Sequence, residues 1–256
     1  MSMRFLYDNE IDDYTLTANS TASGYSVTNL QDSQLEKKYR TSGSSSEWVK
    51  IDAGSGNTFS ANSAAICNHN FSTDGTFKIQ AATNSSELGT TDGLLDEAIA
   101  HSTGIMTEFF NATTARFWRF YIDDTGTTEG YAELGRIFLG VYFAPTNENN
   151  FDWPYQLIDG SEKYESIDGQ VYGDKSRVNR LMTLNFSNVC DTERNDWETM
   201  FEDIHTIEPF VFLYRSTQSA FKTLYCLLNK DLAFNHIIDY TTVHYWNLQV
   251  SLKEHF

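Results

Sequence analysis

The chain has 256 residues, of which 35 are acidic and 18 basic, so its net charge at pH 7 is −17. Such an acidic chain repels nucleic acid and anionic membranes, and it has no run of about 18 apolar residues that could span a bilayer. Its length and its 40% hydrophobic content suffice for one large β domain or two ordinary ones. Residues 1–13 turn acidic without an apolar run, so we expect no signal peptide.

The first half is rich in Ser, Thr, Asn and Gly and contains short runs in which apolar and polar residues alternate. Period-2 runs separated by such loops predict an all-β sandwich or barrel. The predicted strands span residues 48–52, 63–67, 76–81, 115–122 and 134–141.

A Ser-rich loop, TSGSSSE at residues 41–47, precedes the strand that begins at Trp48. We expect Trp48 and Ile51 both to anchor the core, although three-residue spacing puts them on opposite faces of a regular strand and requires a bulge or twist. Trp118 is a further expected core anchor. The loop has no aromatic residue, so we expect it to be a spacer or a protein contact rather than a sugar-binding loop.

A segment without periodicity, APTNENNFDWP at residues 144–154, carries two of the three prolines and predicts a domain boundary. We therefore divide the chain into domains at residues 1–146 and 147–256. In the second domain a hairpin-like stretch at 155–173 and a strand at 179–189 lead into a predicted helix at 191–206.

The predicted helix has one apolar stripe, because its apolar residues fall at positions i, i+3, i+4 and i+7. Asp191 or Thr192 is the expected cap, and Pro209 is expected to end the helix. Strands are predicted afterwards at 210–214, 221–228 and 243–252. The expected core anchors of this domain are Trp197, Phe201 and Trp246.

The order of motifs in the first half resembles the discoidin, or F5/8 type C, jelly roll over residues 20–143. The matching positions are Asn29, Leu30, Asp32, Trp48, Ile51, Asp52, Gly54, Arg116, Arg119, Glu133 and Gly140. The resemblance implies a galactose-binding-like β-sandwich whose loops at one end bind glycans or lipid headgroups. The loop aromatics that could contact a glycan or a partner are Tyr25, Tyr39, Phe59 and Phe71.

The second half resembles the tail-tube-like ring domain of tailed-phage tail proteins. The matching positions are Gly169, Gln170, Tyr172, Arg180 to Leu184, Trp197, Pro209 to Phe212 and Trp246 to Glu254. In that family the ring domain usually opens the chain, whereas here the sandwich comes first. The fold class expected overall is mainly β: an N-terminal jelly roll and a C-terminal tail-tube-like β domain with one amphipathic helix.

Together the two halves resemble the distal tail or tail-tip (baseplate) proteins of long-tailed phages. That resemblance implies a virion protein, made in the host cytoplasm, that forms a ring, with a hexamer as the expected order. Its expected partners are further copies, tail-tube and tail-tip hub proteins, and fibre proteins or host glycans, while DNA passes through an acidic channel without binding.

No catalytic motif is present in the sequence. The six histidines do not occur at HxH, HxxxH or HExxH spacing, and GxSxG, GxGxxG and GxxxxGK[ST] are absent. We expect no enzyme activity and no cofactor. The acidic runs at residues 8–13 and 123–124 could hold Ca²⁺, although neither has EF-hand spacing.

Three functions stay open on the sequence alone. The first is the structural tail-tip protein, and the second is a carbohydrate-binding protein that uses the N-terminal sandwich. The third is a hydrolase with scattered carboxylates, which would need a deep cleft with two carboxylates about 5 to 10 Å apart.

Overall fold

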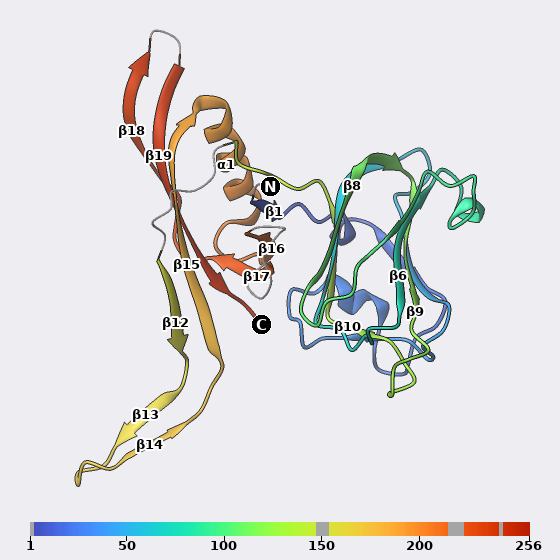
Figure 1. The fold of residues 1–256 in the computed structure, drawn as a ribbon, viewed down its shortest axis with the longest axis horizontal. Coiled ribbons are helices and arrows are strands. Elements are labelled where there is room, and N and C mark those ends of the chain that lie inside the picture. The colour runs from blue at the N-terminus through green and yellow to red at the C-terminus, as the bar shows by residue number, and fades with distance from the viewer. Residues whose placement is uncertain (1–2, 147–153, 215–222, 241–242) are drawn as a thin grey trace.

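The structure, a computed structural model, describes residues 3–146, 154–214, 223–240 and 243–256. These residues form two β units that lie next to one another (Figure 1). The predicted boundary falls largely on residues 147–153, outside the described residues. Within the described part of the chain, no helix has the length and apolar character needed to cross a membrane.

The first unit is a β-sandwich, which confirms the predicted mainly-β fold class. One of its sheets has five strands, in the spatial order β2 (Thr15–Ala18), β4 (Glu47–Asp52), β9 (Phe117–Asp123), β6 (Thr76–Ala82) and β7 (Leu95–Ala98). The opposite sheet consists of β11 (Arg136–Gly140), β5 (Phe59–Cys67) and β8 (Met106–Ala115). The remaining elements are the ladder of β3 (Tyr39–Arg40) with β10 (Glu133–Leu134) and the 3-10 turns η1 (Glu10–Asp12), η2 (Val27–Gln31) and η3 (Ser85–Glu87).

Strict alternation in β4 and β9 decides which residues enter the sandwich core. Ile51 and Trp118 are fully buried, as predicted, and lie opposite one another in the ladder. The prediction that Trp48 anchors the core is wrong, because β4 runs without a bulge and Trp48 therefore points to the outer face, half-buried. Glu47, its neighbour, is the residue that points inward, where its carboxylate accepts a hydrogen bond from Ser20 Oγ at 2.6 Å.

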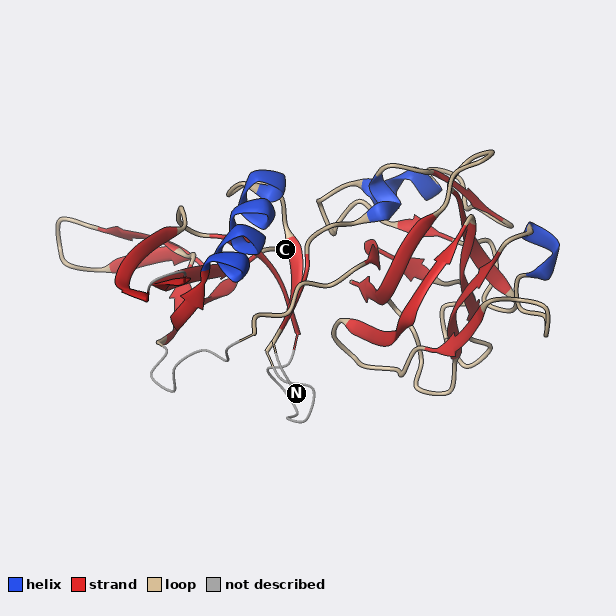
Figure 2. Cartoon of the chain, turned by 90° about the horizontal axis from the view of Figure 1, so that it is seen from above, coloured by secondary structure: helices blue, strands red, loops and turns tan. Residues whose placement is uncertain are grey.

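The second unit is a sheet with one helix packed against it (Figure 2). Its main path is β1 (Arg4–Leu6), β16 (Phe210–Leu213), β17 (Thr223–Leu228), β19 (Val243–Glu254), β15 (Val178–Cys190) and β12 (Tyr155–Asp159), and β18 (Ala233–Tyr240) also pairs with β19. A separate two-stranded ladder is formed by β13 (Glu162–Glu165) and β14 (Val171–Asp174), and the helix is α1 (Asp191–Ile204).

Helix α1 buries the predicted apolar stripe. Trp197 is fully buried, with its ring 4.8 Å from that of Phe143 and 5.1 Å from that of Phe186. Phe201 and Trp246 border this core and are only half-buried, so they are weaker anchors than predicted. The predicted caps are wrong: the N-cap is Cys190, and the carboxylate of Asp191 instead accepts a hydrogen bond from the indole of Trp246 at 3.0 Å.

The first strand of the chain belongs to the second unit, which corrects the predicted domain of residues 1–146. β1 pairs antiparallel with β16, and Phe5 is fully buried against Phe212, with 4.8 Å between the ring centroids. Phe5 and Phe143 also exchange two backbone hydrogen bonds of 2.8 Å. The sandwich is therefore inserted between β1 and the rest of the second unit, and its two connections run side by side.

The three-stranded sheet of the sandwich packs against the second unit. Ala65, Cys67 and Phe138 form one buried cluster with Val211 and Tyr225 of β16 and β17. The hydroxyl of Tyr225 also donates to the backbone oxygen of Ser33 at 2.7 Å. Because this contact covers the β5–β11 side, the outer face of the five-stranded sheet is directed away from the second unit (Figure 1).

Candidate functional site

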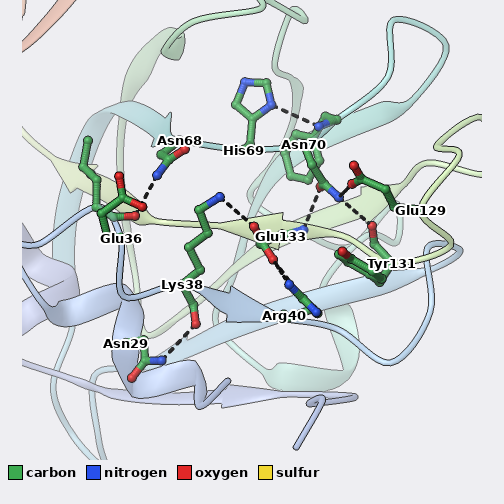
Figure 3. A network of polar contacts seen from close by, with 12 residues as sticks. Asn29, Glu36, Lys38, Arg40, Asn68, His69, Asn70, Glu129, Tyr131 and Glu133 are labelled. Carbon is green, nitrogen blue, oxygen red and sulfur yellow. Dashed lines mark hydrogen bonds and ion pairs between the residues drawn. The ribbon is translucent and has the colours of Figure 1, made fainter. Parts of the chain in front are cut away.

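A cluster of polar and aromatic side chains lies at the β3–β10 end of the sandwich (Figure 3). Arg40 lies between the rings of Tyr25 and Tyr131, with its guanidinium carbon 4.0 and 4.1 Å from the ring centroids. Its Nε donates to Glu133 at 2.8 Å, and its Nη2 donates to the same carboxylate. Two aromatic rings therefore lie against the guanidinium, and at least two of its donors are used.

Glu133 connects this cluster to the neighbouring loops. Lys38 Nζ donates to the Glu133 carboxylate at 2.6 Å, and Asn70 Oδ1 accepts from the Glu133 backbone N–H at 2.8 Å. Burial works to raise the pKa of Glu133, but the hydrogen bonds from Lys38 and Arg40 outweigh it and hold the pKa below its ordinary value. The cluster thus fixes the loops at this end and offers a ligand only its outer edges.

Three of the four predicted contact residues cannot meet a ligand. Tyr39, Phe59 and Phe71 are buried in the sandwich core, because each occupies an inward position and packs with other apolar side chains. Tyr39 also donates its hydroxyl hydrogen to the backbone oxygen of Ser20 at 2.7 Å. Tyr25 is half-buried with one ring face on Arg40, so it alone of the four keeps some exposed surface.

The outer face of β4 and β9 carries aromatic and cationic side chains that sequence reasoning did not assign to a site. We call Trp48, Lys50, Phe117, Arg119 and Tyr121 the aromatic–cationic face. Each is half-buried, and the strand register pairs Trp48 with Tyr121 and Lys50 with Arg119. The alternation that predicted these strands could also have found this face. The residues between the inward-pointing positions point outward, and here they are aromatic or cationic.

A long hairpin extends from the second unit, and we call residues 155–178 the arm (Figure 1). It begins where β12 pairs with β15, and it continues through the β13–β14 ladder. All residues of β12, β13 and β14 are exposed. Its exposed large hydrophobic residues are Tyr155, Leu157, Ile158, Tyr164, Ile167, Val171, Tyr172 and Val178.

The described residues give no metal site. No group of three or more His, Cys, Asp or Glu side chains among them is arranged to hold an ion. In the predicted acidic run at 123–124, the Asp124 carboxylate is buried and accepts hydrogen bonds from the backbone N–H and the hydroxyl of Ser72, so it closes a loop instead. In the run at 8–13, burial followed by the charges of Asp8 and Asp13 raises the pKa of Glu10 to about 7.

A cavity of about 390 Å³ lies between the two units and is lined by two carboxylates, Glu36 and Glu254. Each lies beside a cation: Glu36 is 2.7 Å from Arg177, and Glu254 is 3.6 Å from Arg180. The hydrogen bond from Arg177 lowers the pKa of Glu36, whereas a general acid for glycoside hydrolysis needs a raised one. The arrangement does not favour a hydrolase.

No protein-family model matches the sequence, and no curated protein matches it. Among solved structures the chain is similar to chitosan-binding module 1 of a chitosanase/glucanase from Paenibacillus sp. IK-5, with 17% identity and a TM-score of 0.41 over 52% of this chain and 98% of the module. It is similar to the family 32 carbohydrate-binding module of NanJ from C. perfringens, solved with galactose, with 15% identity and a TM-score of 0.41 over 55% of this chain and 99% of the module. It is also similar to the lectin domain of lectinolysin, solved with Lewis B antigen, with 16% identity and a TM-score of 0.40 over 52% of this chain and 95% of that domain.

Proposed function

We propose that the protein is a non-catalytic assembly subunit that binds neighbouring copies of itself through the arm. The observation that carries the proposal is the exposure of large hydrophobic side chains along residues 155–178. Leu157 is 64% exposed and Ile167 is fully exposed. Soluble proteins rarely expose a large apolar surface unless it binds a partner.

The architecture of the arm supports the same proposal. An isolated two-stranded ribbon is only marginally stable in water, and an unpaired strand edge is a ready template for another strand. β13 and β14 pair only with one another among the described residues, so each has a free edge. Contact with a neighbouring subunit would bury the apolar side chains and pair these edges.

Head-to-tail contacts between identical subunits generate rings when the rotation closes. We infer that copies of this chain form such a ring, with six as the expected number, in the tail tip of a long-tailed phage. The sequence resemblance of the second half to tail-tube-like ring domains supports this inference. The net charge of −17 supports a channel through which DNA passes without binding. The expected partners are tail-tube and hub proteins, and the expected location is the virion.

The test is the mass of the purified full chain by light scattering across a concentration series. We expect multiples of 29.2 kDa. The variant Leu157→Ser should weaken association, because it removes an apolar side chain from the arm. Leu94→Ser is the matched control, since Leu94 is 51% exposed on the sandwich and lies outside the arm. A monomer at every concentration, or equal effects of the two variants, would contradict the proposal.

A second candidate function is carbohydrate binding by the sandwich. The observation that favours it is the aromatic–cationic face, because half-exposed aromatic rings can stack on the apolar faces of sugars while polar neighbours bind the hydroxyl groups. The two functions are compatible, since the arm and this face lie on different units. A glycan array probed with the full chain tests this candidate, and binding to no glycan above background would remove it.

A further inference from the structure

We propose that the aromatic–cationic face binds a polysaccharide built from uronic acids, with the aromatic rings against the sugar rings and the two cations against the carboxylates. This inference rests on the carbohydrate-binding function and adds its site and its class of ligand. It places the site on a sheet face and not in the loops at the end of the sandwich.

The first step is the register that brings these side chains together. In the β4–β9 ladder, the rows on the outer face pair Trp48 with Tyr121, then Lys50 with Arg119, then Asp52 with Phe117. The face therefore has an aromatic pair, a cationic pair and a third aromatic ring in succession. Lys50 Nζ lies 5.7 Å from the centroid of the Trp48 ring on β4 and 5.9 Å from that of the Phe117 ring on β9.

The second step is the charge of the face. Like charges placed directly opposite one another on two strands destabilise a sheet, so the fold alone does not account for Lys50 beside Arg119. The neighbouring cations on this face are paired: Arg116 Nε lies 2.8 Å from Asp52, and Lys78 lies 2.8 Å from Asp96.

In the part of the chain that the structure describes, Lys50 and Arg119 donate hydrogen bonds to neutral acceptors. Lys50 donates to Ser85 Oγ at 3.1 Å, while Arg119 donates to Gln80 Oε1 at 2.6 Å and to the backbone oxygen of Leu88 at 2.9 Å. Two positive charges thus remain without a contacting carboxylate in the described part of a chain whose net charge is −17. Asp52 lies near Lys50 and Asp96 near Arg119, and they offset part of this charge without contacting the two cations. Because neither cation contacts a carboxylate of the protein, both could pair with the carboxylates of a ligand.

The third step is the number of charges that the ligand carries. Lys50 and Arg119 lie near the carboxylates of Asp52 and Asp96, on a strongly acidic protein. This setting suits a polysaccharide of low charge density. A polymer with several sulfates on each sugar would be repelled by the rest of the molecule. A uronic acid carries a single carboxylate on each ring, and arginine and lysine both bind carboxylates through charge-assisted hydrogen bonds.

The fourth step is the shape of the face. Phe117 and Tyr121 are four residues apart on β9, so they are separated by about 13 Å along the strand. This distance fits a short stretch of sugar units lying along the strands. The η3 loop borders the face on the β6 side, where Gly89 has a φ of +73° and a side chain on it would collide with Arg119 Nη2. The close approach of this loop holds Arg119 in place before a ligand arrives.

The test is the affinity of the full chain for polygalacturonate, measured by calorimetry at low salt, with neutral dextran, dextran sulfate and poly-glutamate as comparison ligands. We expect polygalacturonate to bind more tightly than all three. Lys50→Gln and Trp48→Leu should each weaken binding about tenfold, since each removes one contact to the ligand. Lys37→Gln is the matched control, because it removes the same charge from a loop outside the face, and it should leave affinity unchanged.

Lys50→Gln also separates a binding role from a structural one. The substitution removes the like charge opposite Arg119, so its melting temperature should equal or exceed that of the wild type while affinity falls. A lower melting temperature together with unchanged affinity would overturn the inference.

The outcomes distinguish the site from the function. Polygalacturonate binding that survives both variants would place the site elsewhere and overturn this inference, while carbohydrate binding would stand. Binding of only neutral glycans, or equal binding of dextran sulfate or poly-glutamate, would also overturn it. The absence of binding to any glycan would remove the carbohydrate-binding function and the inference together.

Discussion

Lowering the pH from about 7.5 to about 5 should destabilise the protein through His69. Its ring stacks on Phe71 with 4.7 Å between centroids, and its Nδ1 accepts the backbone N–H of Phe71 at 3.2 Å. His101 lies edge-on, 5.9 Å away. Burial lowers the pKa of His69 to about 4, chiefly because a charged imidazolium is poorly solvated there.

The direction of the effect follows from the two protonation states. The unfolded chain binds a proton near the ordinary histidine pKa of 6.5, whereas the folded protein binds it only near 4. The stability contributed by neutral His69 is therefore fully present above about 6.5 and is lost as the pH falls toward 4. A pH of about 5 lies about 1.5 below the unfolded-state pKa of 6.5. Acidification to this pH should therefore lower the free energy of unfolding by about 2 kcal/mol.

The assay is urea denaturation of the wild type and of His69→Asn at the two pH values. The Asn side-chain oxygen can accept the same backbone N–H but cannot gain a charge, so the variant should lose about 2 kcal/mol less than the wild type on acidification. His205→Asn changes an exposed histidine in the same way, and it serves as the control. Equal losses in wild type and His69→Asn would refute the reasoning.

Two further predictions concern the segment that joins the units. Because burial and the nearby Asp8 and Asp13 raise the pKa of Glu10 to about 7, folding is favoured while Glu10 is protonated and is weakened as the pH rises through 7. Glu10→Gln should therefore raise the free energy of unfolding at about pH 8 by about 1 kcal/mol, the figure for a partly screened group, and change it little at about pH 5. Urea denaturation at the two pH values measures this, and an equal effect at both would contradict the prediction. Gly140→Ala should cost about 1 to 3 kcal/mol in urea denaturation, since its Cβ would lie 2.2 Å from the backbone oxygen of Asp8. Gly104→Ala, where a Cβ meets nothing within 4 Å, should be nearly neutral, and similar costs for both would argue against the close packing at Gly140.

Alternation in the sequence was enough to predict the main strands of the sandwich. β4, β6 and β9 all lie where period-2 patterns predicted them, and Ile51 and Trp118 are buried as expected. Alternation does not say which of two faces is the inner one when both contain aromatic residues. Trp48 was expected to anchor the core together with Ile51, whereas the register of β4 places Val49 and Ile51 there.

Elements that depend on distant partners were not predicted. β1 has only three residues and is defined by its pairing with β16, which lies more than 200 positions away in the sequence. No local pattern therefore predicts it. β8 was missed because most of its side chains are not buried, and its sequence therefore lacks a clear apolar face. The insertion of the sandwich into the second unit follows from β1 and was missed with it.

The candidate binding residues show the same limit. Tyr39, Phe59 and Phe71 were chosen as aromatic residues near predicted loops, but loop position does not determine burial. The stretch at 155–173 was predicted as a hairpin, and β12, β13 and β14 lie within 155–174. Its exposure could not be predicted, because its apolar residues resemble those of a strand that packs in a core.

Hydrogen exchange of the arm amides, measured on the full chain at high and at low concentration, tests the central claim most directly. The account predicts that amides in residues 155–178 exchange more slowly at high concentration, because a neighbouring copy covers the arm, while amides of the sandwich core exchange equally at both. The same fast exchange of the arm at every concentration would contradict assembly through it.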